Sequence, residues 1–288
     1  MSDEKPQQDG ALRAMTDDGA FRVVTVRTTS TVQHMLDAQK LTGTLAERLG
    51  ELVTSAVLVR ETMAPDYRLQ ALLRSADNKT RMVADSHPDG GSRGLATHTG
   101  DASSPLSIEG GVFEVVRTLY NGELHRGVVS VPFGGGISAA VMTYLQSSEQ
   151  VASMLSVACV LGGSKVVAAG GYLVQLLPEV GRAPLAIMAE RLSDFRDIGP
   201  LLARTDSALD PLLDELLYGM PYTRLTEDPL SWKCRCSTVR VMSSLSTLPK
   251  KDLADLIEGG QNIGLSCDFC GQTYNISPTQ IAGLMDQS

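Results

Sequence analysis

The sequence predicts an α+β fold in three parts: a mainly antiparallel sheet with packed helices over residues 1–178, a helical linker over 179–232, and a small Cys₄ zinc module over 233–288. Strand-like and helix-like apolar patterns alternate as far as Pro178, and helical apolar spacing follows it. Four of the five cysteines lie in the last part, which has too few apolar residues to build a strong core alone. A bound metal would supply the missing stability.

The composition is that of an ordinary globular protein. The 288 residues exceed the usual size of one domain, and 43% of them are hydrophobic and 20% charged. The chain has 25 basic residues and 33 acidic ones, which gives a formal net charge of -8. Because this charge repels a phosphate backbone, nucleic acid is not an expected partner.

The sequence predicts no targeting or membrane segment. Met1–Gly10 is polar and acidic, without the cationic start and apolar run of a secretion signal. Gly127–Ser148 has no charged residue, but Pro132 and three glycines interrupt it, so we expect soluble core there rather than a membrane span. Five cysteines, one alone and four in two close pairs, do not make a disulfide framework for a chain of this length. We therefore expect a cytoplasmic protein that does not bind membranes.

The expected core begins with a strand and two helices. Phe21–Thr28 is rich in β-branched residues, which predicts a strand, and a helix with one apolar face follows it. A second helix is expected over Thr44–Val59, where leucines and valines recur at helical spacing. Tyr67–Ser75 and Thr80–Asp85 then have the composition of strands.

A hairpin signal indicates that the sheet is mostly antiparallel. Val112–Tyr120 and Glu123–Val131 are joined by Asn121-Gly122, a dipeptide that tolerates positive φ at both turn positions. A helix over Ile137–Gln146 and two apolar strands, Val151–Leu161 and Val166–Leu177, complete the predicted core.

The expected linker consists of short helices. Its apolar residues recur at helical spacing, most clearly in a stripe formed by Leu209, Leu212, Leu213, Leu216 and Leu217. Gly199-Pro200 interrupts the helical pattern, and Gly219 and Pro221 end it. Helices of this length are marginal in water unless their apolar faces are packed, so the linker is expected to depend on its neighbours.

Two cysteine pairs predict one zinc site. Cys234 and Cys236 form a CxC pair, and Cys267 and Cys270 form a CxxC pair thirty residues further on. Each pair can span one edge of a tetrahedron, and the intervening loop lets the two edges face each other. All four histidines lie far upstream, so a Cys₄ site with one zinc per chain is expected. Four thiolates leave no open coordination position, which argues against hydrolytic catalysis and against an enzyme.

The four thiolates also predict sensitivity to oxidants. Zinc keeps its cysteine ligands deprotonated, and thiolates react with peroxide and hypochlorite. Each pair holds two sulfurs close enough to form a local disulfide once zinc is lost. Zinc contributes about 10–16 kcal/mol of apparent binding free energy in small modules, as much as the roughly 5–15 kcal/mol that stabilises a whole domain. Loss of the metal is therefore expected to unfold the module.

Three other interpretations of the cysteines remain open at this stage. The site could be a passive structural zinc staple. Cys267-Asp268-Phe269-Cys270 could serve a thiol-disulfide oxidoreductase, although such motifs normally begin a helix in a βαβ unit. A zinc ribbon that binds nucleic acid is disfavoured by the acidic charge and by an aromatic content of only 5%.

The cysteine pairs and several other segments resemble the heat-shock protein 33 family of redox-regulated, ATP-independent holdase chaperones. Besides the pairs and their spacing, the resemblance rests on YNGELHRGVVSV at 120–131, SSEQ at 147–150, AAGGYLVQLLP at 168–178 and LSTLPKKDLADLI at 245–257. It covers most of the chain.

The resemblance implies a function and a mechanism. The four zinc ligands would be Cys234, Cys236, Cys267 and Cys270. Oxidation would form disulfides among them, release zinc, unfold the linker and expose apolar surface to unfolding client proteins, and the oxidised chains would form homodimers. Cys159 lies outside the switch motif, and we expect it to be a small buried hydrophobic residue rather than a nucleophile.

Overall fold

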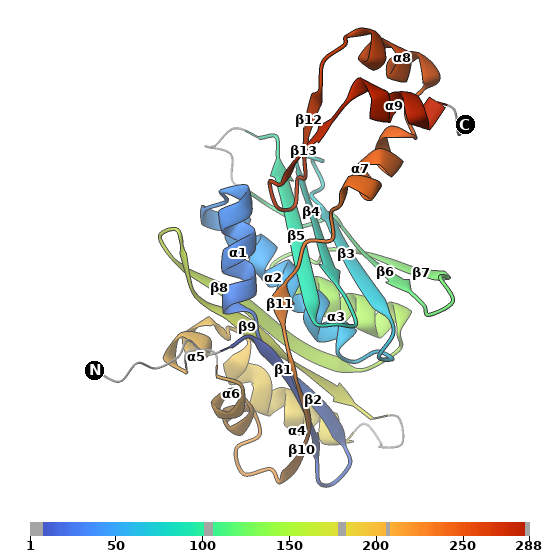
Figure 1. The fold of residues 1–288 in the computed structure, drawn as a ribbon. Coiled ribbons are helices and arrows are strands. Elements are labelled where there is room, and N and C mark those ends of the chain that lie inside the picture. Colours follow the sequence, from blue (N-terminus) through green and yellow to red (C-terminus); the bar gives the residue numbers. More distant parts are fainter. Residues whose placement is uncertain (1–7, 101–105, 178–182, 206–207, 286–288) are drawn as a thin grey trace. The chain divides into compact units, whose positions relative to one another are not determined.

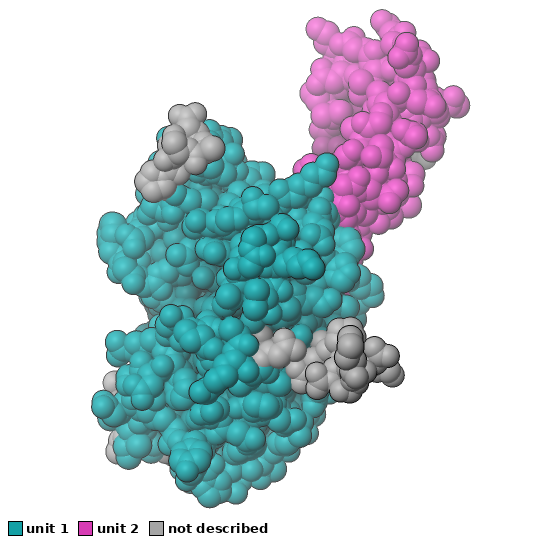
Figure 2. Space-filling model, turned by 90° about the vertical axis from the view of Figure 1, so that its left-hand side faces the viewer, with its two compact units in different colours: residues 1–233 teal, residues 234–288 magenta. Residues whose placement is uncertain are grey.

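The computed structural model describes residues 8–100, 106–177, 183–205 and 208–285. The chain separates into two compact units, residues 1–233 and 234–288 (Figure 2). Antiparallel sheets and packed helices make up the first unit, which confirms the predicted α+β class (Figure 1). No helix in the described ranges combines the length and the apolar character needed to cross a bilayer.

The first unit contains a five-stranded antiparallel sheet, called sheet A here. Its strands are β1 (Gly10–Thr16), β2 (Phe21–Arg27), β8 (Ser153–Gly162), β9 (Lys165–Leu176) and β10 (Tyr222–Pro229). They lie in the order β10-β1-β2-β9-β8. The long hairpin β8–β9 turns at Gly163, whose φ of 70° suits a residue without Cβ.

A second sheet, called sheet B, has six strands in the order β11-β5-β4-β3-β6-β7. These are β3 (Arg68–Arg74), β4 (Thr80–Ser86), β5 (Gly91–His98), β6 (Val112–Thr118), β7 (Leu124–Ser130) and the two-residue β11 (Ser231–Trp232). All neighbours are antiparallel except β11 and β5. The predicted hairpin around Asn121-Gly122 is present as β6–β7, with a positive φ at Gly122.

Helix α2 (Gly43–Arg60) lies between the two sheets and contacts strands of both. From Leu52 to its end every residue is buried, as expected for a helix with neighbours on all sides. Helices α1 (Thr29–Gln39) and α3 (Gly136–Ser148) add to the same core, which also takes side chains from the inner face of each sheet.

The opposite face of sheet A is covered by the helices that follow β9. These are α4 (Ala183–Arg191), the 3-10 turn η1 (Leu192–Phe195), α5 (Gly199–Arg204) and α6 (Leu209–Leu216). In Figure 1 they lie on the side of β1, β2 and β9 that faces away from α2. Alternate residues of each strand therefore point into two different apolar clusters, as Leu173 and Val174 of β9 do.

The prediction of helices over 179–232 needs one correction. Its described part contains the short helices α4, η1, α5 and α6, but Tyr222–Pro229 and Ser231–Trp232 are strands. Strand β10 pairs with β1 across more than 200 residues of sequence. Its side chains are almost all exposed, so no apolar alternation marked it as a strand.

The second unit is small. It contains α7 (Thr238–Leu245), α8 (Lys250–Glu258), the hairpin β12 (Ile263–Ser266) and β13 (Thr273–Ile276), and α9 (Pro278–Met285). Its buried apolar residues in the described range are Leu245, Leu253, Ile276 and Ile281. Such a core supplies little stability without a further constraint.

Candidate metal centre

The second unit brings the four predicted ligands together. Cys234 and Cys236 lie on the extended segment before α7, while Cys267 and Cys270 lie in the turn between β12 and β13. The four Sγ atoms all lie within 4.8 Å of one another. The Sγ–Sγ distance is 3.7 Å between Cys234 and Cys267 and 3.4 Å between Cys236 and Cys270.

These distances fit a tetrahedral zinc ion. With Zn–S bonds of about 2.3 Å, the sulfurs of a regular tetrahedron lie roughly 3.8 Å apart. The two short distances approach that value, and every cysteine of the set is partly buried. In the described ranges no other group of three or more His, Cys, Asp or Glu side chains has this arrangement. The cluster is therefore a possible metal site with an all-thiolate donor set.

The turn that carries Cys267 and Cys270 directs backbone N–H groups at sulfur. The N–H groups of Phe269 and Cys270 hydrogen-bond to the sulfur of Cys267, and that of Gln272 bonds to the sulfur of Cys270. Gly271 makes this turn possible with a φ of 71°, and its own N–H donates to the Cys267 carbonyl at 2.7 Å. The turn thus forms a knuckle whose backbone N–H groups approach the two sulfurs.

The thiols differ in acidity when no metal is bound. Burial opposes ionisation of Cys234, but hydrogen bonds from the Cys236 backbone and from neighbouring thiols prevail and lower its pKa to about 7. Burial raises the pKa of Cys267 and of Cys270. Cys234 is therefore the first of these three to become a thiolate, the form that binds metal and reacts with oxidants.

One further contact in the centre was not predicted. The hydroxyl of Tyr274 on β13 donates a hydrogen bond to the sulfur of Cys236 at 3.0 Å. This bond, followed by burial and the neighbouring sulfurs, raises the pKa of Tyr274 to about 12. The only signal in the sequence is a tyrosine shortly after the second cysteine pair.

The geometry does not support dithiol catalysis. Cys267 and Cys270 lie in a hairpin turn between two short strands, and not at the start of a helix in a βαβ unit. A helix N-terminus is the usual device that activates the attacking thiol of an oxidoreductase.

Cys159 lies outside the centre, as expected. It is buried on β8, where a Cβ added at Gly50 of α2 would come within 2.6 Å of its sulfur. Burial, together with the charges of Glu51 and Glu47, raises its pKa to about 12. This thiol is therefore inert at neutral pH.

Comparison with known proteins decides the family. Residues 9–277 match the family model described as Hsp33 protein. The chain belongs to the Hsp33 family. The chain is 30% identical to the 33 kDa chaperonin of Syntrophotalea carbinolica, with 96% of this chain and 99% of the relative covered. It is 29% identical to the 33 kDa chaperonin of a Synechocystis species over 97% and 96% of the two chains.

A solved structure supports the same fold. The 33 kDa chaperonin of Thermotoga maritima superposes with a TM-score of 0.84 over 98% of this chain and 99% of that one, at 22% identity. Hsp33 proteins are redox-regulated chaperones that act as non-enzymatic holdases, bind client proteins and bind zinc. The chain is thus a redox-regulated chaperone with a possible four-cysteine metal site.

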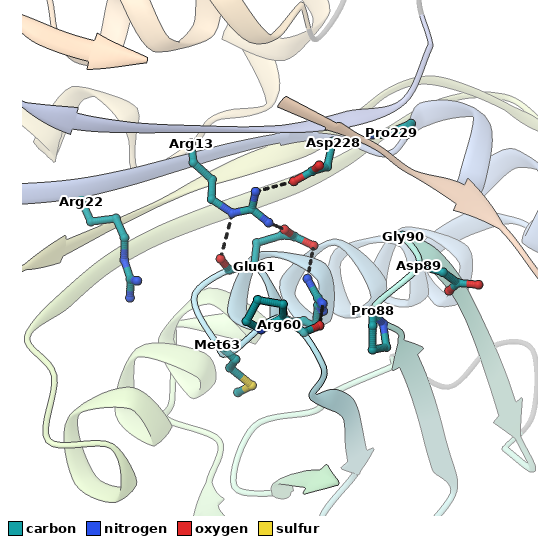
Figure 3. A pocket seen from close by; sticks show the side chains of 11 residues that line it. Arg13, Arg22, Arg60, Glu61, Met63, Pro88, Asp89, Gly90, Asp228 and Pro229 are labelled. Atoms are coloured by element: carbon teal, nitrogen blue, oxygen red, sulfur yellow. Dashed lines mark hydrogen bonds and ion pairs between the residues drawn. The ribbon is translucent and has the colours of Figure 1, made fainter. Parts of the chain in front are cut away.

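An ionic network joins β10 to the core and was not visible in the sequence. Arg13 on β1 forms ion pairs with Asp228 of β10 and with buried Glu61 after α2 (Figure 3). It also donates to Thr226 Oγ1 at 2.6 Å. Glu61 also accepts from Arg60 at 3.1 Å. Arg13 thus ties an exposed strand of the predicted linker to a buried carboxylate.

The end of the predicted linker has a second attachment. Trp232 stacks on His34 of α1, with ring centroids 5.9 Å apart and planes 9° from parallel. The N–H of Leu230 donates to the carbonyl of Asp9 at 3.0 Å, and the N–H of Lys233 donates to that of Ser92 at 3.0 Å. The chain is therefore held against the first unit up to the residue before Cys234.

Proposed function

We propose that this chain is a holdase whose activity is switched on when oxidation removes one zinc ion from Cys234, Cys236, Cys267 and Cys270. In the reduced state the four thiolates hold the metal and the second unit is folded. Oxidation of four thiolates to two disulfides gives up four electrons, which two equivalents of peroxide accept as they are reduced to water. Zinc leaves as Zn²⁺, because disulfide sulfur no longer carries the charge that binds it.

The disulfides are proposed to form within each pair. Once the metal leaves, the small core of the second unit cannot hold the two pairs together. Cys234 stays close to Cys236, and Cys267 to Cys270, because closing a short loop costs little entropy. A disulfide between a cysteine of one pair and a cysteine of the other would require the second unit to stay folded after zinc leaves.

The observation that carries the proposal is the two-sided burial of sheet A. One face packs on α1 and α2, and the other packs on α4, α5 and α6. Of these three, α5 has 6 residues, α6 has 8 and α4 has 9, lengths at which an isolated helix does not persist in water. Their stability therefore comes from the sheet face and from their attachments.

Release of residues 179–232 would expose a broad apolar surface. Four leucines of α6 are buried against sheet A: Leu209, Leu212, Leu213 and Leu216. The sheet face beneath contributes Leu12, Phe21, Val23, Tyr172 and Val174 to the same cluster. An exposed patch of this kind binds other apolar surfaces, which unfolding client proteins supply. The same patch can pair two oxidised chains, so homodimers are part of the proposal.

The proposed place of action is the cytoplasm, where thiols stay reduced until oxidative stress. A light-scattering assay tests the switch, with a thermally unfolding client and the chain either reduced and zinc-loaded or treated with peroxide. Suppression of aggregation by the oxidised chain alone is the expected result. Equal suppression by both forms would show that the zinc site is a passive staple.

A further inference from the structure

The Arg13 network borders a cavity of about 510 Å³, a size typical of small-molecule sites. Its walls come from β1, β2, the end of α2, the segment around Met63 and Pro65, the loop around Asp89, and the end of β10. Figure 3 shows that Arg22 stands apart from the group formed by Arg13, Glu61 and Arg60. The cavity lies in the first unit, within residues 1–233.

Every carboxylate that lines this cavity already has a cationic partner. The two oxygens of Glu61 are taken by Arg13 and Arg60, one each. Asp228 pairs with Arg13, and Asp89 pairs with Lys233 at 2.8 Å. All three carboxylates of the cavity wall are therefore engaged by cations other than Arg22.

Arg22 is partly buried and has no acidic partner among the residues that the structure describes. Its hydrogen bond goes from Nη2 to the amide oxygen of Gln175 at 2.5 Å, and no carboxylate in the described part of the chain forms an ion pair with it. Its Nε is buried without a hydrogen-bond partner, as is the Nε of Arg60. A desolvated cation without a counter-charge is costly to fold, and donors left unpaired add to that cost.

The sheet register places the two arginines as neighbours. Arg22 lies opposite Met15 on β1, so it is the diagonal neighbour of Arg13 on the same face of sheet A. Burial, and then the charge of Arg13, lowers the pKa of Arg22 from its usual value. An anion between the two guanidinium groups would relieve this repulsion. It would accept hydrogen bonds from their planar N–H donors, an arrangement that suits phosphate and carboxylate groups.

We propose that this cavity binds a small oxyanion, a phosphate or carboxylate group, with Arg22 as the main ligand and Arg13 as its neighbour. The site is distinct from the four cysteines and from the apolar cluster of the proposed client surface. Its ligand class follows from the guanidinium of Arg22, which has no carboxylate partner among the described residues, and from its neighbour Arg13.

Titration calorimetry of the full-length, reduced, zinc-loaded chain tests the proposal, with inorganic phosphate in one arm and malonate in the other. We expect saturable binding in at least one arm, with an affinity that falls as sodium chloride is added. The arm that binds more tightly identifies the preferred group. R22Q should weaken binding by about tenfold or more, because it removes a charge-assisted interaction, whereas R22K should retain part of it.

R74Q is the matched control, since it removes the same charge from an exposed position on sheet B and should bind as the wild type does. Zinc content and thermal unfolding of R22Q verify that the variant folds. Absence of saturable binding of both anions to the wild-type chain would overturn the proposal. So would equal affinities of R22Q and wild type, or an equal loss in R74Q.

Discussion

The hydroxyl of Tyr274 donates to the sulfur of Cys236 across 3.0 Å, and the two residues are 38 positions apart in the sequence. A hydrogen bond to a thiolate spreads its charge and makes it a weaker nucleophile. We expect Y274F to lower zinc affinity by about tenfold, the lower end of what loss of an outer partner costs, and to speed zinc release by peroxide. A chromogenic zinc chelator measures both. Y218F, at a tyrosine that is 79% exposed, should behave as wild type. Identical rates of zinc release in Y274F and wild type would show that Tyr274 has no role in the switch.

The ligand assignment predicts the effect of losing one thiolate. C267S leaves three sulfurs, and we expect zinc affinity to fall by more than the roughly 10–100-fold that loss of an outer partner costs. The second unit should lose amide protection even without oxidant, because its own core is small. C159A should keep wild-type zinc content, since Cys159 is buried in the first unit. Wild-type zinc affinity in C267S would contradict the assignment.

Oxidation is predicted to release the linker and to leave the core folded. After peroxide treatment and zinc loss, amides of α5 and α6 should exchange rapidly, while those of α2 stay protected. The reason is that α2 is buried between two sheets, whereas α6 packs against sheet A with one of its faces only. Hydrogen exchange followed by mass spectrometry resolves these segments. Unchanged protection of α6 after zinc loss would mean that the signal does not pass through the linker.

A substitution that creates a cavity under α6 should release part of the linker without oxidation. Leu213 is fully buried, so L213A is expected to destabilise the packing of α6 by about 2–5 kcal/mol. The reduced variant should then show partial holdase activity and faster exchange in α6. I187A is the control, because Ile187 on α4 is 72% exposed and its truncation should change stability by no more than about 0.5 kcal/mol. A destabilised L213A without any gain in activity would separate linker release from client binding.

The two carboxylates bound to Arg13 are predicted to differ in importance. Asp228 is 54% exposed, so D228N should cost about 0–1 kcal/mol and mainly speed exchange in β10. Glu61 is buried, and E61Q should cost about 3–5 kcal/mol because it leaves the guanidinium of Arg60 without its counter-charge. Urea unfolding gives both values. D210N, which removes an exposed ion pair with Arg224, is the control for a surface charge. Equal losses in D228N and E61Q would refute this distinction.

Local patterns were sufficient for much of the fold. The β6–β7 hairpin, the β8–β9 hairpin and α2 have strong periodicity or turn residues, and the structure contains each of them near the predicted bounds. Strands β1 and β5 were not predicted, because GALRAMT and GSRGLATH mix glycine, arginine and small residues without a clear alternation. Their strand conformation depends on pairing with neighbours that lie elsewhere in the sequence.

The candidate site divides in the same way. The cysteine spacing was sufficient to predict the cluster, because metal ligands obey short-range spacing rules. The contact of Tyr274 with Cys236 and that of Arg13 with Asp228 depend on how distant segments meet. The periodicity of one segment does not indicate which distant segment it will contact.

The stack of Trp232 on His34 gives this chain an optical reporter of its own. Trp232 is the one tryptophan among 288 residues, and it lies two positions before Cys234. Indole emission depends on the rings and the water around it, so separation of the two rings would change the colour and intensity of the fluorescence. No dye or added label is needed to follow the event in real time. A stopped-flow record of tryptophan emission, beside a record of zinc release, would give the order in which metal loss and detachment of the linker occur.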